Sequence, residues 1–157
     1  MRPLADGRHT SDGGHPDPPQ RAGRDDGPLH IPLITEDDLL MVRHAVRSAS
    51  VAVGFSIIDQ TRVITAASEL ARNAYVHGGG GSLTIDSARD EGRTGLRLTI
   101  SDHGPGIPDL AAALTDGYST GVGLGHGLGG ARRLMDEFEV RTEPGAGTTI
   151  ITTRWRR

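Results

Sequence analysis

The sequence contains neither lysine nor cysteine. All 17 basic residues of the 157-residue chain are arginines. A P-loop ATPase needs a lysine on the nucleotide phosphates, and a eukaryotic-type protein kinase needs one on a strand. The missing lysine therefore excludes both of these phosphate-binding designs. The missing cysteine excludes disulfide bonds and thiolate metal sites, and it gives no sign of an oxidising compartment.

Aromatic residues and long apolar runs are also scarce. Aromatic residues make up 3% of the chain and hydrophobic residues 35%, so the core must be aliphatic. No apolar run approaches the roughly eighteen residues of a membrane span, and the N-terminus has no apolar signal core. We therefore expect a soluble, cytoplasmic protein that does not contact a membrane. The formal net charge of -3 argues against nucleic acid as a partner.

The first 28 residues have almost nothing to bury. They are rich in glycine, proline, aspartate and arginine, a composition typical of disordered segments. We therefore predict a disordered tail at residues 1–28 and a single domain at residues 29–157.

Helical periodicity appears at two places near the start of this domain. Thr35 and Asp38 resemble a capping box, and the apolar residues behind them recur at helical spacing as far as about Gly54. After a turn at 58–60, a second amphipathic helix is expected at 61–77. Its inward positions are Val63, Ile64, Ala67, Leu70, Ala71 and Ala74.

Most of the remaining sequence has strand or turn patterns. A short helix is expected at 109–114 and a longer one at 127–136, with Ala131 and Leu134 inward. Alternating apolar residues predict two hairpins, one formed by strands 82–88 and 95–101 and the other by strands 138–142 and 148–154. A further strand is expected at 29–34, and its proline places it at a sheet edge. Together the elements predict an α+β fold. It would be a two-layer α/β sandwich with helices on one face of a largely antiparallel mixed sheet.

The helix at 61–77 carries a pair of polar residues suited to chemistry. Glu69 and Asn73 are four residues apart, so they project from the same helix face. A carboxylate can accept a proton or align a nucleophile, while an amide oxygen suits a cation such as Mg²⁺. Four glycines then end the helix. Taken alone, the pair is more typical of a solvated face on an ordinary helix.

Two glycine-rich segments give the pair its context. Asp102 begins Asp-His-Gly-Pro-Gly-Ile-Pro at a strand end, where a carboxylate can accept a hydrogen bond from the exocyclic amine of a flat ring. Gly-Pro-Gly is also ordinary turn chemistry. Residues 121–130 place glycines mostly at alternate positions before a helix, which leaves backbone N–H groups available for phosphates. A flexible linker is the alternative for this second segment.

The order of these motifs resembles the Bergerat-fold ATPases, the group that contains gyrase, Hsp90, histidine kinases and MutL (GHKL). An E-x-x-x-N helix is followed by D-x-G-x-G, G-x-G-x-G and a glycine-threonine turn at 147–148. Within this group the chain is similar to the small bacterial serine/threonine kinases of the anti-sigma and stressosome switch type. The stretches that carry this likeness are 58–62, 68–73, 102–109, 116–120 and 133–138, and the resemblance covers about residues 29–157.

The resemblance implies ATP and Mg²⁺ as cofactors and a role for each matched residue. Glu69 would be the catalytic base, Asn73 would hold Mg²⁺, and Asp102 would read adenine with support from Thr148. His77 is expected to cap its helix, and residues 118–121 would belong to a lid. The implied adenine-pocket residues are Gly104, Gly106 and Ile107, and those of the lid and phosphate site are Ser119, Thr120, Gly121, Gly123, Leu124, Gly125, His126 and Gly127.

The resemblance also implies a function. The chain would transfer the γ-phosphate of ATP to a STAS-domain antagonist or scaffold in a sigma-factor partner-switching pathway of the stress response. A PP2C-type phosphatase or a sigma factor would be a further partner. The alternative is a nucleotide-gated anti-sigma binding module with little turnover, although an intact Glu69 favours the enzyme. A sensor histidine kinase is disfavoured, because no dimerisation helix with a phosphoacceptor histidine precedes the ATP-binding segment.

Overall fold

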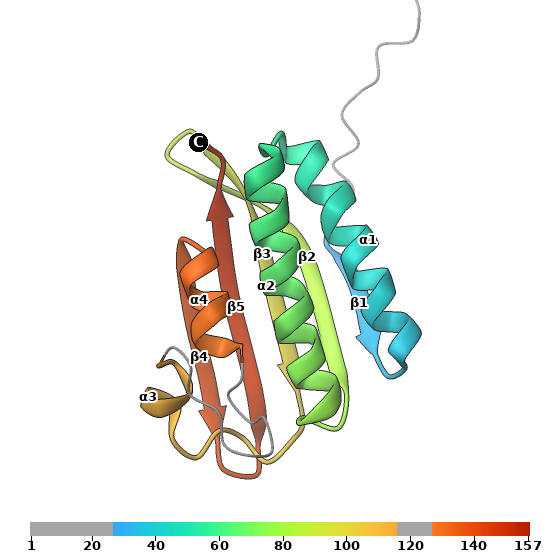
Figure 1. Cartoon of the computed structure of the whole chain (residues 1–157), viewed down its shortest axis with the longest axis vertical. Coiled ribbons are helices and arrows are strands. Elements are labelled where there is room, and N and C mark those ends of the chain that lie inside the picture. The colour runs from blue at the N-terminus through green and yellow to red at the C-terminus, as the bar shows by residue number, and fades with distance from the viewer. Residues whose placement is uncertain (1–26, 116–126) are drawn as a thin grey trace, which may run out of the picture.

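The computed structural model describes residues 27–115 and 127–157 (Figure 1). The predicted tail at 1–28 falls almost wholly outside these ranges and stays a prediction. None of the described helices has the length and apolar character needed to span a bilayer. The elements in chain order are β1 (Leu29–Leu33), α1 (Glu36–Val53), α2 (Ile57–Val76), β2 (Gly81–Asp90), β3 (Arg93–Asp102), α3 (Leu110–Ala113), α4 (Leu128–Leu134), β4 (Glu137–Glu143) and β5 (Gly147–Trp155).

The five strands form one sheet in the order β1-β2-β3-β5-β4. Helices α1, α2 and α4 cover one face of this sheet (Figure 1). The predicted α+β two-layer fold is therefore confirmed, and β1 with its proline is an edge strand as expected. All four described strand pairings are antiparallel, where the prediction allowed a mixed sheet.

The core between the two layers is aliphatic. Val42 and Val46 of α1, Leu83 of β2 and Leu98 of β3 all belong to this core and are fully buried. Each inward position expected on α2 is buried as well. Helix α1 begins at the predicted capping box, in which Thr35 and Asp38 satisfy each other's backbone N–H groups. It ends at Gly54, which adopts a left-handed backbone conformation.

Helix α2 begins four residues earlier than predicted. The segment 58–60, expected to be a turn, is its first turn. Ser56 is the N-cap, because its hydroxyl accepts a hydrogen bond from the backbone N–H of Asp59 at 3.1 Å. A serine at the N-cap satisfies one of the exposed N–H groups of a helix start. The Ser56 hydroxyl in turn donates a hydrogen bond to the Asp59 carboxylate at 3.1 Å. The corner between α1 and α2 therefore lies at 54–56.

Helix α4 is shorter than the predicted helix at 127–136. It ends at Leu134, and Met135 already has extended backbone. Asp136 instead binds the end of β5, since its carboxylate accepts a hydrogen bond from the backbone N–H of Trp155 at 2.7 Å. Ala131 is buried as expected, whereas Leu134 is only partly buried.

Candidate functional site

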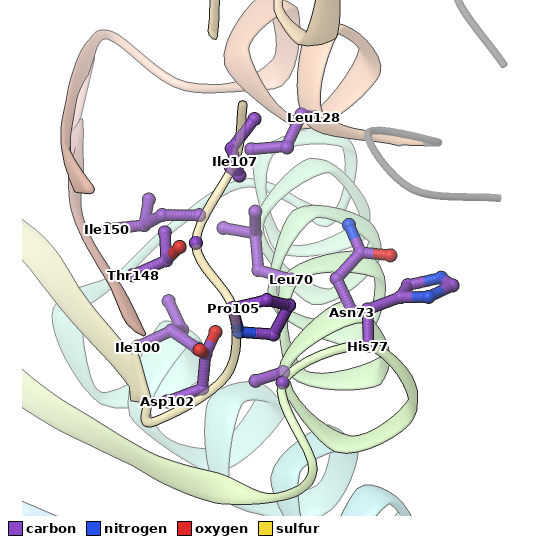
Figure 2. Close-up of a pocket in the computed structure, with 13 residues that line it drawn as sticks. Leu70, Asn73, His77, Ile100, Asp102, Pro105, Ile107, Leu128, Thr148 and Ile150 are labelled. Carbon is purple, nitrogen blue, oxygen red and sulfur yellow. The ribbon is translucent and has the colours of Figure 1, made fainter. Parts of the chain in front are cut away.

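A pocket lies between the C-terminal half of α2 and the sheet (Figure 2). Its position follows from strand register, because Asp102 at the end of β3 stands directly opposite Thr148 at the start of β5. Most of the lining is apolar, which suits a flat ring, with a few polar groups that can fix its orientation. The lining residues are Leu70, Asn73, Ala74, His77, Gly78, Ile100, Asp102, Pro105, Gly106, Ile107, Leu128, Thr148 and Ile150.

Asp102 presents one of its two carboxylate oxygens to this pocket. Its Oδ1 accepts a hydrogen bond from the backbone N–H of Gly104 at 2.9 Å. The other oxygen has no hydrogen-bond partner within the described parts of the chain. It can therefore accept a hydrogen bond from a ligand.

A hydroxyl pair lies beside Asp102. The Oγ1 atoms of Thr148 and Thr142 are 3.1 Å apart, and that of Thr142 accepts a hydrogen bond from the backbone N–H of Ile107 at 2.9 Å. Thr142 thus joins the loop after β3 to the pocket wall. Sequence reasoning missed it, because its role depends on facing Thr148 across the β4–β5 ladder.

Asn73 and His77 form the opposite wall. Both come from the last turns of α2, and Figure 2 shows their side chains projecting from the same side of the helix. His77 is the C-cap residue, as expected, and its backbone N–H donates to the carbonyl of Asn73 at 2.9 Å. Its imidazole also lines the pocket.

Glu69 lies one turn before Asn73, at the junction of α2 with α4. Its carboxylate is packed against Gly127, where an added Cβ would come within 2.7 Å of Oε2. Gly127 also has a φ of +84°, so both space and backbone conformation favour glycine there. Within residues 27–115 and 127–157 the Glu69 carboxylate has no hydrogen-bond or ion-pair partner. Its carboxylate is therefore available to interact with a ligand.

The first glycine segment is held against the turn between β4 and β5. Gly106 has a φ of +80°, and a Cβ there would come within 2.5 Å of the carbonyl oxygen of Glu143. Gly145 donates a backbone hydrogen bond to the carbonyl of Pro105 at 3.0 Å. Gly106 and Ile107 line the pocket, and their expected contact with adenine stays a prediction. Gly104 lies behind the Asp102 carboxylate rather than in the lining.

The predicted lid and most of the predicted phosphate site lie outside the described residues. Their roles therefore stay predictions. The residues concerned are Ser119, Thr120, Gly121, Gly123, Leu124, Gly125 and His126.

The described side chains do not form a closed metal site. No group of three or more histidine, aspartate or glutamate side chains in these ranges could hold a metal ion. Asn73 offers one amide oxygen at the pocket wall. One protein oxygen fits an ion such as Mg²⁺, which keeps several waters and is usually shared with substrate phosphates.

Comparison with known proteins agrees with this geometry. Residues 58–156 match the family described as histidine kinase-, DNA gyrase B- and HSP90-like ATPases. The serine/threonine-protein kinase RsbT of Bacillus subtilis is 43% identical over 127 residues, which span 81% of this chain and 96% of that protein. The anti-sigma F factor of Halalkalibacterium halodurans is 35% identical over 100 residues, which span 59% of this chain and 67% of that protein.

A solved structure has a similar fold. The structure of the RsbU and RsbW domains of Rv1364c from Mycobacterium tuberculosis superposes with a TM-score of 0.55 at 25% sequence identity. The match covers 82% of this chain but 32% of that one, so this chain corresponds to about a third of the larger protein.

Proposed function

Because this chain belongs to the histidine kinase-, DNA gyrase B- and HSP90-like ATPase family, we propose that it is an ATP-dependent serine/threonine kinase of a sigma-factor partner-switching system. Its substrate would be a serine or threonine of a STAS-domain antagonist or scaffold. A PP2C-type phosphatase would be a further partner.

One observation carries this proposal. Residues from three distant segments meet around a single pocket: Asn73 from α2, Asp102 from β3 and Thr148 from β5. Glu69 lies one helical turn from Asn73, toward α4. In this proposal the base lies at the Asp102–Thr148 end of the pocket and the phosphates extend past Asn73 toward Glu69.

Each residue has a distinct task in this proposal. The open oxygen of Asp102 accepts a hydrogen bond from the adenine amine, and the Thr148 hydroxyl supports that contact. Mg²⁺, when bound through Asn73 and the phosphates, supplies positive charge that neutralises the triphosphate. Glu69 accepts the proton of the attacking hydroxyl, a role that typically contributes about 10²–10⁴-fold to a rate.

A transfer assay tests the proposal. The full chain is incubated with γ-³²P-ATP and purified STAS-domain proteins from the same organism, and label is located by peptide mapping. We expect label on a serine or threonine of one STAS protein with the wild-type chain, and labelling about 10²–10⁴-fold slower with Glu69→Ala. Absence of label on every STAS protein tested would contradict the kinase assignment.

The alternative is an anti-sigma binding module that uses ATP without turnover. The 35% identity to an anti-sigma F factor supports this second reading. ATP-dependent capture of a sigma factor, without phosphorylation of any STAS protein, would favour it over the kinase.

A further inference from the structure

Glycines from three separate segments surround Asp102. Gly78 follows α2, Gly104 lies in the loop after β3, and Gly147 begins β5. A Cβ added at Gly78 would overlap Cγ of Asp102 and come within 2.5 Å of its Cβ. A Cβ at Gly104 would come within 2.6 Å of the Gly78 Cα, and one at Gly147 would overlap the Asp102 carbonyl oxygen. None of the three positions has room for a side chain.

Backbone conformation does not explain the glycine at position 78. Within the run 78–81, Gly79 has a φ of +71° and meets nothing within 4 Å, so it is needed for its conformation. Gly78 has no positive φ, yet a side chain there would collide with Asp102 and with the carbonyl oxygen of Ala74 at 2.7 Å. Ending the helix therefore accounts for Gly79, while the space for Asp102 accounts for Gly78.

The atoms around Gly78 have little freedom to move away. Asp102 is paired in the ladder with Gly81 on one side and Thr148 on the other, so its backbone is held from both directions. The Ala74 carbonyl belongs to α2 and accepts a hydrogen bond from the backbone N–H of Gly80 at 3.0 Å. Rotation of the Asp102 side chain can move its Cγ and carboxylate away, but not its Cβ or the Ala74 carbonyl oxygen. A side chain at position 78 is therefore accommodated only if the Asp102 carboxylate rotates and the ends of α2 and β3 also move apart.

That rotation would disturb the surface offered to a nucleotide base. The carboxylate is now held by the N–H of Gly104, and Figure 2 shows it directed into the pocket toward Pro105. This orientation keeps one oxygen on the Gly104 amide and leaves the other for the ligand.

We propose that Gly78 is a positioning residue for base selection, because it leaves the space in which Asp102 is held ready to accept a hydrogen bond from a 6-aminopurine. The inference rests on the proposed ATP site. It assigns the preference for 6-amino over 6-oxo or unsubstituted purines partly to Gly78, a residue of the glycine run that follows α2.

The test compares Gly78→Ala with Gly27→Ala in the full chain. Gly27 is an exposed position before β1 with nothing within 4 Å of an added Cβ, so it controls for a glycine-to-alanine change. Calorimetry measures the dissociation constants of ATP, GTP and purine riboside triphosphate, which lacks the amine. In wild type and Gly27→Ala we expect ATP to bind about 10- to 100-fold more tightly than the purine analogue. In Gly78→Ala this ratio should fall to within about threefold of unity, mainly through weaker ATP binding.

Asp102→Asn separates failure of this inference from failure of the ATP site. If Asp102→Asn lowers the ratio and Gly78→Ala leaves it at the wild-type value, the role of Gly78 is wrong. Equal weakening of all three nucleotides by Gly78→Ala would also overturn it, because general damage to the pocket does not change the ratio. If Asp102→Asn leaves the ratio unchanged, the adenine assignment itself is wrong and the inference falls with it.

A stability cycle keeps the inference testable if Gly78→Ala folds poorly. Asp102→Gly removes Cβ and Cγ, the two atoms of Asp102 that the new methyl group would meet, while the contact with the Ala74 carbonyl oxygen remains in both backgrounds. Gly78→Ala should therefore lower the melting temperature clearly in the wild-type background and much less in the Asp102→Gly background. An equal loss in the two backgrounds would show that the methyl group does not act through Asp102.

Discussion

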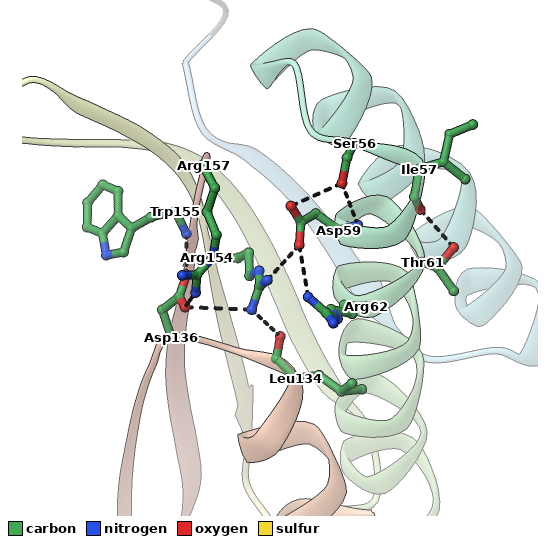
Figure 3. Close-up of polar contacts among 10 residues, drawn as sticks. All are labelled: Ser56, Ile57, Asp59, Thr61, Arg62, Leu134, Asp136, Arg154, Trp155 and Arg157. Carbon is green, nitrogen blue, oxygen red and sulfur yellow. Dashed lines mark hydrogen bonds and ion pairs between the residues drawn. The ribbon is translucent and has the colours of Figure 1, made fainter.

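Arg154 of β5 donates a 2.5 Å hydrogen bond to Asp59, which lies 95 positions earlier in the first turn of α2 (Figure 3). Their side chains are only 6% and 11% exposed. Arg154 also donates to the carbonyl of Leu134 at the end of α4, at 3.3 Å. This ion pair therefore ties together β5, α2 and α4, the elements that also carry Thr148, Asn73 and Leu128 of the pocket.

Removal of Asp59 should be strongly destabilising. Asp59→Ala removes the closest partner of the buried Arg154 guanidinium and leaves its longer ion pair with Asp136 at 3.6 Å, so we expect a loss approaching the roughly 3–5 kcal/mol typical of a buried charge left unpaired. The free energy of unfolding from urea titration measures this cost. Glu139→Ala is the control, because its ion pair with Arg141 is 54% and 67% exposed and should contribute at most about 1 kcal/mol. Equal losses in the two variants would contradict a special role for the buried pair.

The same pair should make stability depend on pH in the acid range. Burial raises the pKa of Asp59, but hydrogen bonds from Arg154 and Ser56, with the charges of Arg154 and Arg62, outweigh it and lower the pKa below the ordinary value. The folded protein therefore holds this proton more weakly than the unfolded chain does. The stabilisation is present above the unfolded pKa of about 3.9 and is lost as pH falls through the folded pKa.

Asp59→Asn keeps the shape but not the charge, so it isolates this effect. The difference in unfolding free energy between wild type and Asp59→Asn should be constant from pH 7 to about pH 5 and shrink below about pH 4. Asp38, whose pKa is lowered mainly by backbone hydrogen bonds from Ile34 and Thr35, is common to both proteins and cancels in the difference. A difference independent of pH down to pH 3 would mean that Asp59 is not the group responsible.

Local features of the fold were predictable from the sequence. The capping box at Thr35 and the inward positions of α2 follow from periodicities that involve neighbouring residues only. The start of α2 was mispredicted although Ser56 and Asp59 form a recognisable cap. Ile57 and Ile58 behind that cap are 80% and 65% exposed, so the apolar pattern that normally indicates an inward helix face gives no signal there.

Features that depend on the meeting of distant segments were not predictable. The Asp102–Thr148 pairing needs the β3–β5 register, which helical or strand periodicity does not determine. The same is true of Thr142, whose hydroxyl matters only because Ile107 and Thr148 are brought to it. Asn73 and Asp102 were singled out by residue type and spacing, but their expected roles, and Thr148 altogether, came from the motifs of a known family.

Thr142 should support nucleotide binding without a contact to the Asp102 carboxylate. Thr142→Val keeps the shape but leaves the N–H of Ile107 and the hydroxyl of Thr148 without this partner. An unpaired, partly buried polar group costs about 1–3 kcal/mol, so we expect ATP to bind roughly tenfold more weakly. Calorimetry measures this loss, and Thr142→Ser should restore most of the affinity. Wild-type affinity in Thr142→Val would show that the hydroxyl pair does not shape the pocket.

Asn73 and Glu69 should have separable effects. Asn73→Ala is expected to weaken ATP binding much more with Mg²⁺ than without it, because its proposed role is to supply an oxygen to the ion. Glu69→Ala should leave Mg²⁺-ATP binding nearly intact and slow phosphoryl transfer about 10²–10⁴-fold. Calorimetry with and without Mg²⁺, followed by single-turnover transfer, distinguishes the two. The division of roles is wrong if both variants lose Mg²⁺-ATP binding equally.

The isolated protein should hydrolyse ATP very slowly and need its partner to react. Phosphoryl transfer depends on in-line positioning of the acceptor, and Glu69 can serve only a hydroxyl within about 3 Å of it. The adjacent Ser68 does not offer one, since its hydroxyl donates to the carbonyl of Ile64 at 2.7 Å. We therefore expect the acceptor to arrive on another molecule, at the junction of α2 and α4 where Glu69 meets Gly127. Single-turnover assays with and without a STAS-domain protein should give little free phosphate alone and protein label with the partner. Rapid phosphate release by the chain alone, with no label on any added partner, would indicate a plain ATPase instead of a kinase.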